Sequence, residues 1–197
     1  MIPEKFIYLA ALLNLTSTAT YIFAIVRGDT RPNRVTWFIW MLAPFIAVFA
    51  QLAEGVGLST LIVFMGGVGP LIILISSFTN QNAYWQTTPF DWVCGALALI
   101  GLVGWWLTKD GDIAIFFSIA TDFCAALPTV RKSYIHPQSE NGVTYLLAFL
   151  SNVIGLLCVQ QKTFAGYAFI SYMTIMCGFI GLIIYSRKSI LAGNIKT

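Results

Sequence analysis

The stretch SIATDFCAALPTVRKS, residues 118–133, places one acidic residue and one proline inside an otherwise apolar run. The acid is Asp122, and the proline, six residues later, is Pro128. In a helix surrounded by water neither would be unusual. Inside a bilayer both cost free energy, because an ionised Asp near the centre of a membrane helix is unfavourable by about 2.5–3.5 kcal/mol and Pro removes a backbone donor. The surroundings of the stretch therefore decide what these two residues mean.

The composition of the whole chain indicates a membrane protein. Of its 197 residues, 58% are hydrophobic and only 10% are charged, whereas soluble domains carry about 25% charged residues. So few polar side chains could not cover a protein surface in water. The net charge of +3 is small and scattered over predicted loops, which argues against nucleic-acid binding. The four cysteines lie singly in apolar segments, as is typical of buried structural cysteines.

Seven apolar runs are each long enough to cross a bilayer, whose core of about 30 Å requires roughly 20 residues of helix. Between them lie segments rich in turn-forming and charged residues, such as RGDTRPNR and KDGD. No cleavable signal is recognisable before the first run, which we therefore expect to be a span. The predicted spans are residues 5–27, 34–53, 57–79, 89–108, 111–132, 141–161 and 163–186.

The distribution of Lys and Arg predicts how the chain crosses the membrane. With seven spans, the N-terminus and the loops after the second, fourth and sixth spans share one side. That side holds three cationic residues, Lys5, Lys109 and Lys162, and the other side holds eight: Arg27, Arg31, Arg34, Arg131, Lys132, Arg187, Lys188 and Lys196. The positive-inside rule places the richer side in the cytoplasm. We therefore expect the N-terminus outside, the C-terminus inside and the protein in the cell (inner) membrane.

The two halves of the chain repeat one pattern. Segment 14–27, NLTSTATYIFAIVR, aligns with segment 118–131, SIATDFCAALPTVR, and both end in Val-Arg. After a polar loop, RVTWFIWMLAP (34–44) matches GVTYLLAFLSN (142–152). Each unit contains three spans, and the single span between the units gives both the same orientation in the membrane.

This pattern predicts an all-α membrane fold of seven helices, arranged as two parallel three-helix bundles joined by a linker helix. Together with the helix-end sequence LPTVRKSYIHPQSENGVTY, it resembles the SWEET and PQ-loop superfamily, although Thr129 stands where the family's Gln follows its Pro. The resemblance covers nearly the whole chain. It implies a three-plus-one-plus-three arrangement and transport of a small polar solute by alternating access. The predicted units are a first bundle, 1–79, a linker, 80–110, and a second bundle with a short cytoplasmic tail, 111–197.

Asp122 is the only acidic residue well inside a predicted span, so it should face the bundle interior or water. The functional interpretation is a proton or cation site that changes its protonation during a transport cycle. The alternative is a structural Asp that braces its helix by a hydrogen bond to a Ser or Thr of the first span, such as its repeat equivalent Thr18. Acids within membrane helices are by default functional, so we favour proton coupling. The cystine-exporting branch of the PQ-loop family also carries acids in this helix, and the resemblance implies a coupling role.

Aromatic and amide residues in the second span of each unit predict a solute-binding pocket. Trp37 and Tyr145 are repeat equivalents, as are Pro44 and Asn152. Trp40 lies one turn beyond Trp37, on the same helix face as Pro44. Two aromatic walls and an amide suit a small polar solute with a flat face. Because Trp37 and Tyr145 begin their helices, anchoring at the membrane interface is a competing interpretation for these two. Further hydrogen bonds could come from Asn14, Gln51, Tyr172 and Thr174.

Pro44 and Pro128 lie within predicted spans, where a missing backbone donor kinks a helix. In a carrier such kinks can serve as hinges between moving bundles. Prolines are also common in membrane helices without this role, so both readings stay open.

Transport of a sugar, an amino acid or a vitamin-like solute is the function that these features favour. The alternative is a non-transporting receptor, as in the KDEL-receptor branch that shares this fold. Such a receptor needs cationic side chains in its cavity, and every Arg and Lys lies at or beyond a span end. We do not expect an enzyme, because the lone His136 lies in a loop and cannot build a metal or nucleophilic site within the membrane. We expect no cofactor, metal or nucleic acid; the partners are the solute and the lipid bilayer, with a homo-oligomer left open.

Overall fold

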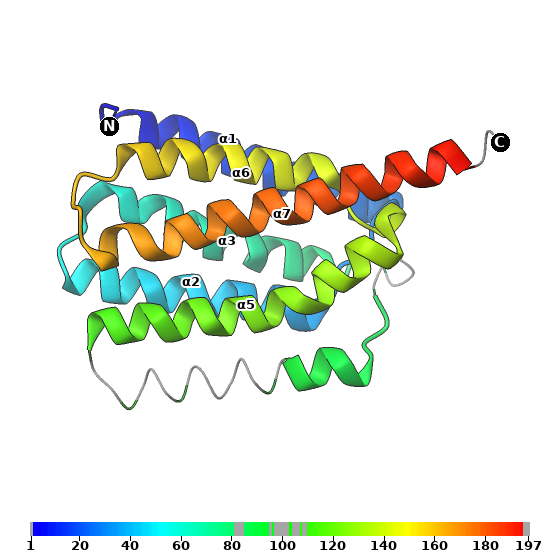
Figure 1. Cartoon of the computed structure of the whole chain (residues 1–197), viewed down its shortest axis with the longest axis horizontal. Coiled ribbons are helices and arrows are strands. Elements are labelled where there is room, and N and C mark those ends of the chain that lie inside the picture. Colours follow the sequence, from blue (N-terminus) through cyan, green and yellow to red (C-terminus); the bar gives the residue numbers. More distant parts are fainter. Residues whose placement is uncertain are drawn as a thin grey trace.

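The computed structural model describes residues 2–80, 85–94, 96, 103, 107 and 110–194, and every regular element among them is helical (Figure 1). Two short 3-10 helices, η1 (Gly57–Ser59) and η2 (Pro137–Ser139), precede α3 and α6. The predicted linker helix, 89–108, falls largely outside the described residues. Within that range, residues 89–94 are described and helical. The six long helices are α1 (Phe6–Arg27), α2 (Arg34–Ala53), α3 (Thr60–Ser76), α5 (Gly111–Ile135), α6 (Gly142–Cys158) and α7 (Phe164–Asn194).

These helices have the length and composition of membrane spans. Five of them, with η1 counted as the first turn of α3, are long and apolar enough to cross a membrane. The sixth, α6, is also apolar and has 17 residues, which is the lower end of the range that can span a bilayer. Large apolar side chains such as Phe23, Phe49 and Leu182 are 66–71% exposed, as a lipid-facing surface requires. The chain is therefore an all-helical protein whose helices fit a bilayer.

The predicted spans agree with the described helices to within about three residues, except at the end of α7. That helix continues to Asn194 instead of stopping at residue 186, and Figure 1 shows it projecting beyond its neighbours. The apolar run does end there, but a helix can continue into water. Arg187 and Lys188 hold this extension by donating hydrogen bonds to the backbone carbonyls of Tyr134 (3.0 Å) and Glu140 (2.9 Å).

Local sequence explains where several helices begin and end. Asn33 and Asn141 occupy equivalent positions of the repeat, and each side chain accepts hydrogen bonds from the first backbone N–H groups of α2 and α6 respectively. Asp110 caps α5 in the same way. At the end of α1, Gly28 adopts a φ of 79°, a left-handed conformation that glycine reaches without strain.

The helices of the two halves of the chain make equivalent packing contacts. Within the halves, α3 contacts α1 and α2, and α7 contacts α5 and α6. Between the halves, α1 packs on α6 and α2 packs on α5. Exchanging α1, α2 and α3 for α5, α6 and α7 converts each of these contacts into another of the same set. The sequence repeat is thus matched by a repeat in the packing.

The loops gather at two ends of the helix bundle (Figure 1). The N-terminal end carries residues 2–5 and the α2–α3 and α6–α7 connections. The opposite end, here called the basic end, carries the α1–α2 and α5–α6 connections and the C-terminal part of α7. A cluster of buried apolar side chains, including Ile7, Val63, Ile115 and Phe169, fills the N-terminal end. The middle of the bundle lies between this cluster and the loops of the basic end.

Candidate functional site

A cavity of about 90 Å³ lies in the middle of the bundle, and all six long helices contribute to its wall. Trp37, Trp40 and Tyr145 give it an aromatic surface. None of the lining residues that the structure describes is Lys, Arg or His. The polar part of the wall consists of Asn14, Ser17, Thr18, Asp122, Thr144, Tyr145 and Asn152.

The cavity brings together the residues for which the sequence predicts a pocket. Trp37, Trp40, Pro44, Tyr145 and Asn152 all line it. Trp37 and Tyr145 are only 5% and 4% exposed. Anchoring at the membrane interface is therefore wrong for these two, because an anchor must reach the headgroup region. Their contact with a solute stays a prediction.

Of the four residues proposed as further hydrogen-bonding groups, Asn14 lines the cavity, whereas Gln51, Tyr172 and Thr174 are not among its lining residues. Gln51 is buried near the N-terminal end, where its side chain donates to the Ala165 carbonyl at 2.8 Å. The Thr174 hydroxyl donates to the Ile170 carbonyl of its own helix at 2.7 Å. Neither residue is part of the described cavity wall.

Asp122 lines the cavity and is 7% exposed. Its carboxylate accepts a hydrogen bond of 2.7 Å from the Tyr172 hydroxyl of α7, and its backbone carbonyl accepts one of 3.3 Å from the Trp40 indole N–H. Thr18 does not brace it: the Thr18 hydroxyl donates to the Asn14 carbonyl of its own helix at 3.1 Å. The partner expected on the first span is therefore replaced by a tyrosine on the last.

Asn152 presents an unpaired acceptor at the cavity. The residue is fully buried, and its Oδ1 atom has no hydrogen-bond partner in the part of the chain that the structure describes. Its Nδ2 atom donates only to the Cys177 sulfur, at 3.7 Å, and sulfur is a weak acceptor. A buried polar atom left without a partner costs about 1–3 kcal/mol. A bound molecule with an N–H or O–H group would recover that free energy.

Gly69 lets α3 approach the polar face of α1 at the cavity wall. A Cβ atom at this position would lie 2.7 Å from Thr18 Oγ1 and 3.5 Å from Asn14 Oδ1. A side chain there would displace Thr18 and would contact Asn14. The glycines of the MGGVGP segment thus serve close helix packing next to the cavity.

The two hinge candidates lie in different surroundings. Pro44 is inside α2 and lines the central cavity. Pro128 is inside α5 and lines a second hollow, of about 270 Å³, at the basic end with Trp85, Arg131 and His136 among others. Figure 1 shows α5 changing direction in its C-terminal part, which contains Pro128. Proline kinks a helix because it lacks the backbone N–H donor and because its ring clashes with the preceding turn. Movement of the helices about either proline stays a prediction.

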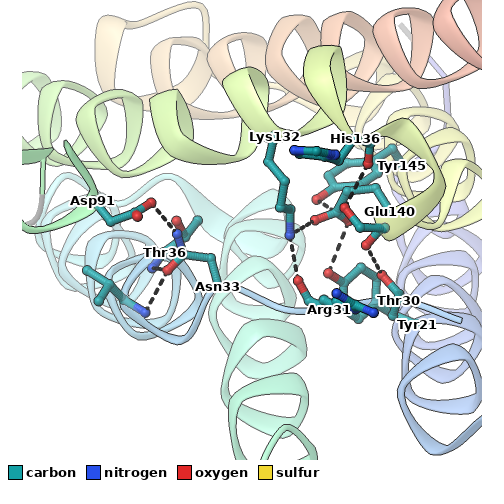
Figure 2. A network of polar contacts seen from close by, with 12 residues as sticks. Tyr21, Thr30, Arg31, Asn33, Thr36, Asp91, Lys132, His136, Glu140 and Tyr145 are labelled. Carbon is teal, nitrogen blue, oxygen red and sulfur yellow. Dashed lines mark hydrogen bonds and ion pairs between the residues drawn. The ribbon is translucent and has the colours of Figure 1, made fainter. Parts of the chain in front are cut away.

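A buried polar network lies at the basic end, next to the cavity (Figure 2). Lys132 of α5 forms an ion pair with Glu140 Oε1, and both residues are 2% exposed. The other carboxylate oxygen of Glu140 accepts hydrogen bonds from the hydroxyls of Tyr21 (3.0 Å) and Tyr145 (3.4 Å). Lys132 also donates to the Arg31 carbonyl at 2.6 Å. Because Tyr145 lines the cavity as well, it connects the cavity wall directly to the ion pair.

The network joins the two halves of the chain. The α1–α2 loop contacts the α5–α6 loop at the Ser139 carbonyl. The Thr30 hydroxyl donates a hydrogen bond to this carbonyl at 2.7 Å, and the Arg31 backbone N–H donates another at 3.0 Å. On α1, Ser17 donates to the Thr144 carbonyl at the start of α6 at 2.8 Å. The loops of the basic end are therefore joined by polar contacts, whereas the N-terminal end is filled by apolar side chains.

Sequence reasoning assigned no role to Lys132 and Glu140 as a pair. Lys132 was counted among the cytoplasmic charges, and Glu140 stood in a polar loop. The only signal is that Glu140 is the single acidic residue in the basic segment KSYIHPQSEN, residues 132–141. Their contact depends on η2 turning the loop back over α5, and no sequence spacing predicts that turn.

Metal ligation has no support in the described ranges, where no group of three or more His, Cys, Asp or Glu side chains could hold an ion. Comparisons with known proteins found no match among family models, curated proteins or solved structures. The function must therefore be argued from the cavity and from the network at its basic end.

Proposed function

We propose that the protein transports a small polar solute, which binds in the central cavity and is exposed alternately to the two sides of the membrane. The observation that carries this proposal is a cavity in the middle of an apolar helical bundle, whose largely apolar and aromatic wall carries a few polar side chains, Asp122 and Asn152 among them. In lipid, polar residues such as Asp122 and Asn152 are retained where they face a solute pathway. Secondary transporters built from repeats place their solute sites near the bilayer midplane, between the repeats.

The packing supports a SWEET-like three-plus-one-plus-three arrangement, with bundles at residues 1–79 and 111–197 and a linker at 80–110. The most extensive contacts between the halves are those of α1 with α6 and of α2 with α5, and all four of these helices line the cavity. Rocking one bundle against the other would open one end of the cavity at a time. Opening the basic end would require the contacts of Lys132 and Glu140 to part.

Cys177 of α7 lines the cavity and offers a test that requires no knowledge of the solute. In a variant that retains Cys177 and carries Ala at the other three cysteines, a small membrane-impermeant methanethiosulfonate should modify Cys177 from either face of the membrane. Right-side-out and inside-out vesicles give the two faces. A matched variant that retains only Cys158, which is fully buried near the N-terminal end, should stay unmodified.

Modification of Cys177 from one face only, or from neither, would contradict alternating access. One-sided modification is the behaviour of a receptor, whose cavity opens to a single compartment. The labelling does not depend on the charge or identity of the solute.

The orientation of the chain can be tested with the same reagent. Gln138 is exposed at the basic end, and Lys162 is exposed in the α6–α7 connection at the opposite end. The basic end keeps the excess of cations even though Glu140 neutralises Lys132, since seven remain against three. In a cysteine-free background, Lys162→Cys should be labelled in intact cells and Gln138→Cys only after permeabilisation. The reverse pattern would invert the topology.

A further inference from the structure

The described wall of the central cavity carries charge of one sign only. Asp122 is its single acidic residue, and the wall includes no basic one. In a medium of low dielectric constant an anionic solute would be repelled by Asp122 with no cation to compensate. The cavity is therefore suited to a cation, or to a neutral molecule when Asp122 is protonated.

Among the residues that the structure describes, no cationic side chain faces Asp122 from the helices around it. The titratable groups near its carboxyl are the Tyr172 hydroxyl and the Cys177 thiol of α7, with Tyr145 of α6 also in the wall. The facing residues of α2 and α1 are neutral: Trp40, Asn14, Ser17 and Thr18. An ionised Asp122 thus depends on a cation from outside the protein, and without one it is neutralised by a proton.

We propose that the transported solute is a small organic cation with N–H groups, and that this cation and a proton compete for Asp122. This inference rests on the proposed function. Binding one cation releases one proton from the carboxyl, so the cavity is electrically neutral with either occupant. A neutral cavity is the form that can move within the bilayer at the lowest cost, because an uncompensated charge there is unfavourable.

Other groups of the wall suit the same solute. The unpaired Asn152 Oδ1 is an acceptor for an N–H donor. The centroids of the Trp37 and Trp40 rings lie 5.1 Å apart, at an interplanar angle of 88°. Tryptophan is the side chain whose ring attracts a cation most strongly. Acceptors and aromatic rings without a cationic side chain form a site for a donor-rich cation.

Guanidinium, urea and nitrate test the charge preference directly, because all three are planar and have four heavy atoms. We expect millimolar guanidinium chloride to raise the melting temperature of the detergent-purified full chain relative to sodium chloride at equal ionic strength. Urea and sodium nitrate should leave it unchanged. Competition with one proton predicts that the apparent affinity for guanidinium falls by roughly tenfold per pH unit on the acidic side of the titration.

Asp122→Asn should remove the guanidinium effect, whereas Tyr167→Phe, which removes a hydroxyl of α7 outside the described cavity wall, should keep it. If the Asn variant does not fold, the pH dependence of guanidinium affinity in the wild-type protein still tests whether the cation and a proton compete. The proposal is overturned by equal stabilisation with all three compounds, by stabilisation with none, by affinity that does not change with pH, or by a guanidinium effect that persists in Asp122→Asn. Two-sided reactivity of Cys177 would still support transport in each of those cases.

Discussion

Glu140→Ala should lower the free energy of unfolding by about 3–5 kcal/mol, because it leaves the Lys132 ammonium as an unpaired charge in a buried site. The same substitution removes the acceptor of the Tyr21 and Tyr145 hydroxyls. Lys132 would retain its hydrogen bond to the Arg31 carbonyl and its contact with the Trp85 ring, whose centroid lies 5.4 Å from Nζ. Thermal unfolding of the detergent-purified protein, followed by tryptophan fluorescence, measures the loss.

A double variant separates the charge from the packing. Lys132→Met with Glu140→Gln removes both charges and keeps an amide oxygen for the two tyrosines. Replacing a buried ion pair by neutral groups of similar volume is often close to neutral for stability. We therefore expect the double variant to be more stable than Glu140→Ala, by about 2 kcal/mol or more. If Glu140→Ala instead costs less than about 1 kcal/mol, the pair behaves as a solvent-exposed one and does not seal the basic end.

The helices could be predicted because a membrane span needs a continuous run of apolar residues, and such runs are visible in the sequence. The breaks between spans consist of residues that begin or end helices, such as Asn33 before α2, Gly28 after α1 and Asp110 before α5. The end of α7 was missed for the same reason. The composition shows where the apolar run ends. A helix, in contrast, ends only where its backbone hydrogen bonds end.

The cavity residues were also largely predictable. A polar side chain in an apolar span must avoid lipid, so Asp122 and Asn152 could be assigned to the interior without a structure. The repeat alignment then placed Trp37 and Tyr145 at equivalent positions of their helices. Both arguments use only positions along one helix, which the sequence gives.

The partners of these residues could not be predicted. The Tyr172 hydroxyl reaches Asp122 across the α5–α7 contact, 50 residues away in sequence. That pairing depends on how α7 is rotated about its axis, and a helix that is apolar all round has no sequence pattern that fixes its rotation. The pair of Lys132 and Glu140 is hidden for a different reason, since it depends on the path of a loop. Contacts between elements therefore required the three-dimensional structure.

Asp122→Asn should abolish the response of transport to a pH gradient. If one carboxyl carries either a proton or the cation, an acidic vesicle interior drives protons out and guanidinium in, so wild-type vesicles should accumulate labelled guanidinium. Asn cannot change its charge, and accumulation should disappear while the protein stays folded. Tyr167→Phe is the matched control: it removes an α7 hydroxyl that donates to the Val159 carbonyl at 3.4 Å, outside the described cavity wall, so its response to the gradient should persist.

The position of Asp122 is compatible with the proposed exchange of a proton or a cation from either side of the membrane. It precedes Arg131 by nine residues, a distance of about 14 Å along the helix axis at roughly 1.5 Å per residue. The carboxyl is therefore remote from the charged surface at the basic end, yet it lies in the wall of a cavity that all six long helices share. Accumulation in the Asp122→Asn variant equal to that of the wild type would make Asp122 a structural residue, held by Tyr172 and without a part in coupling.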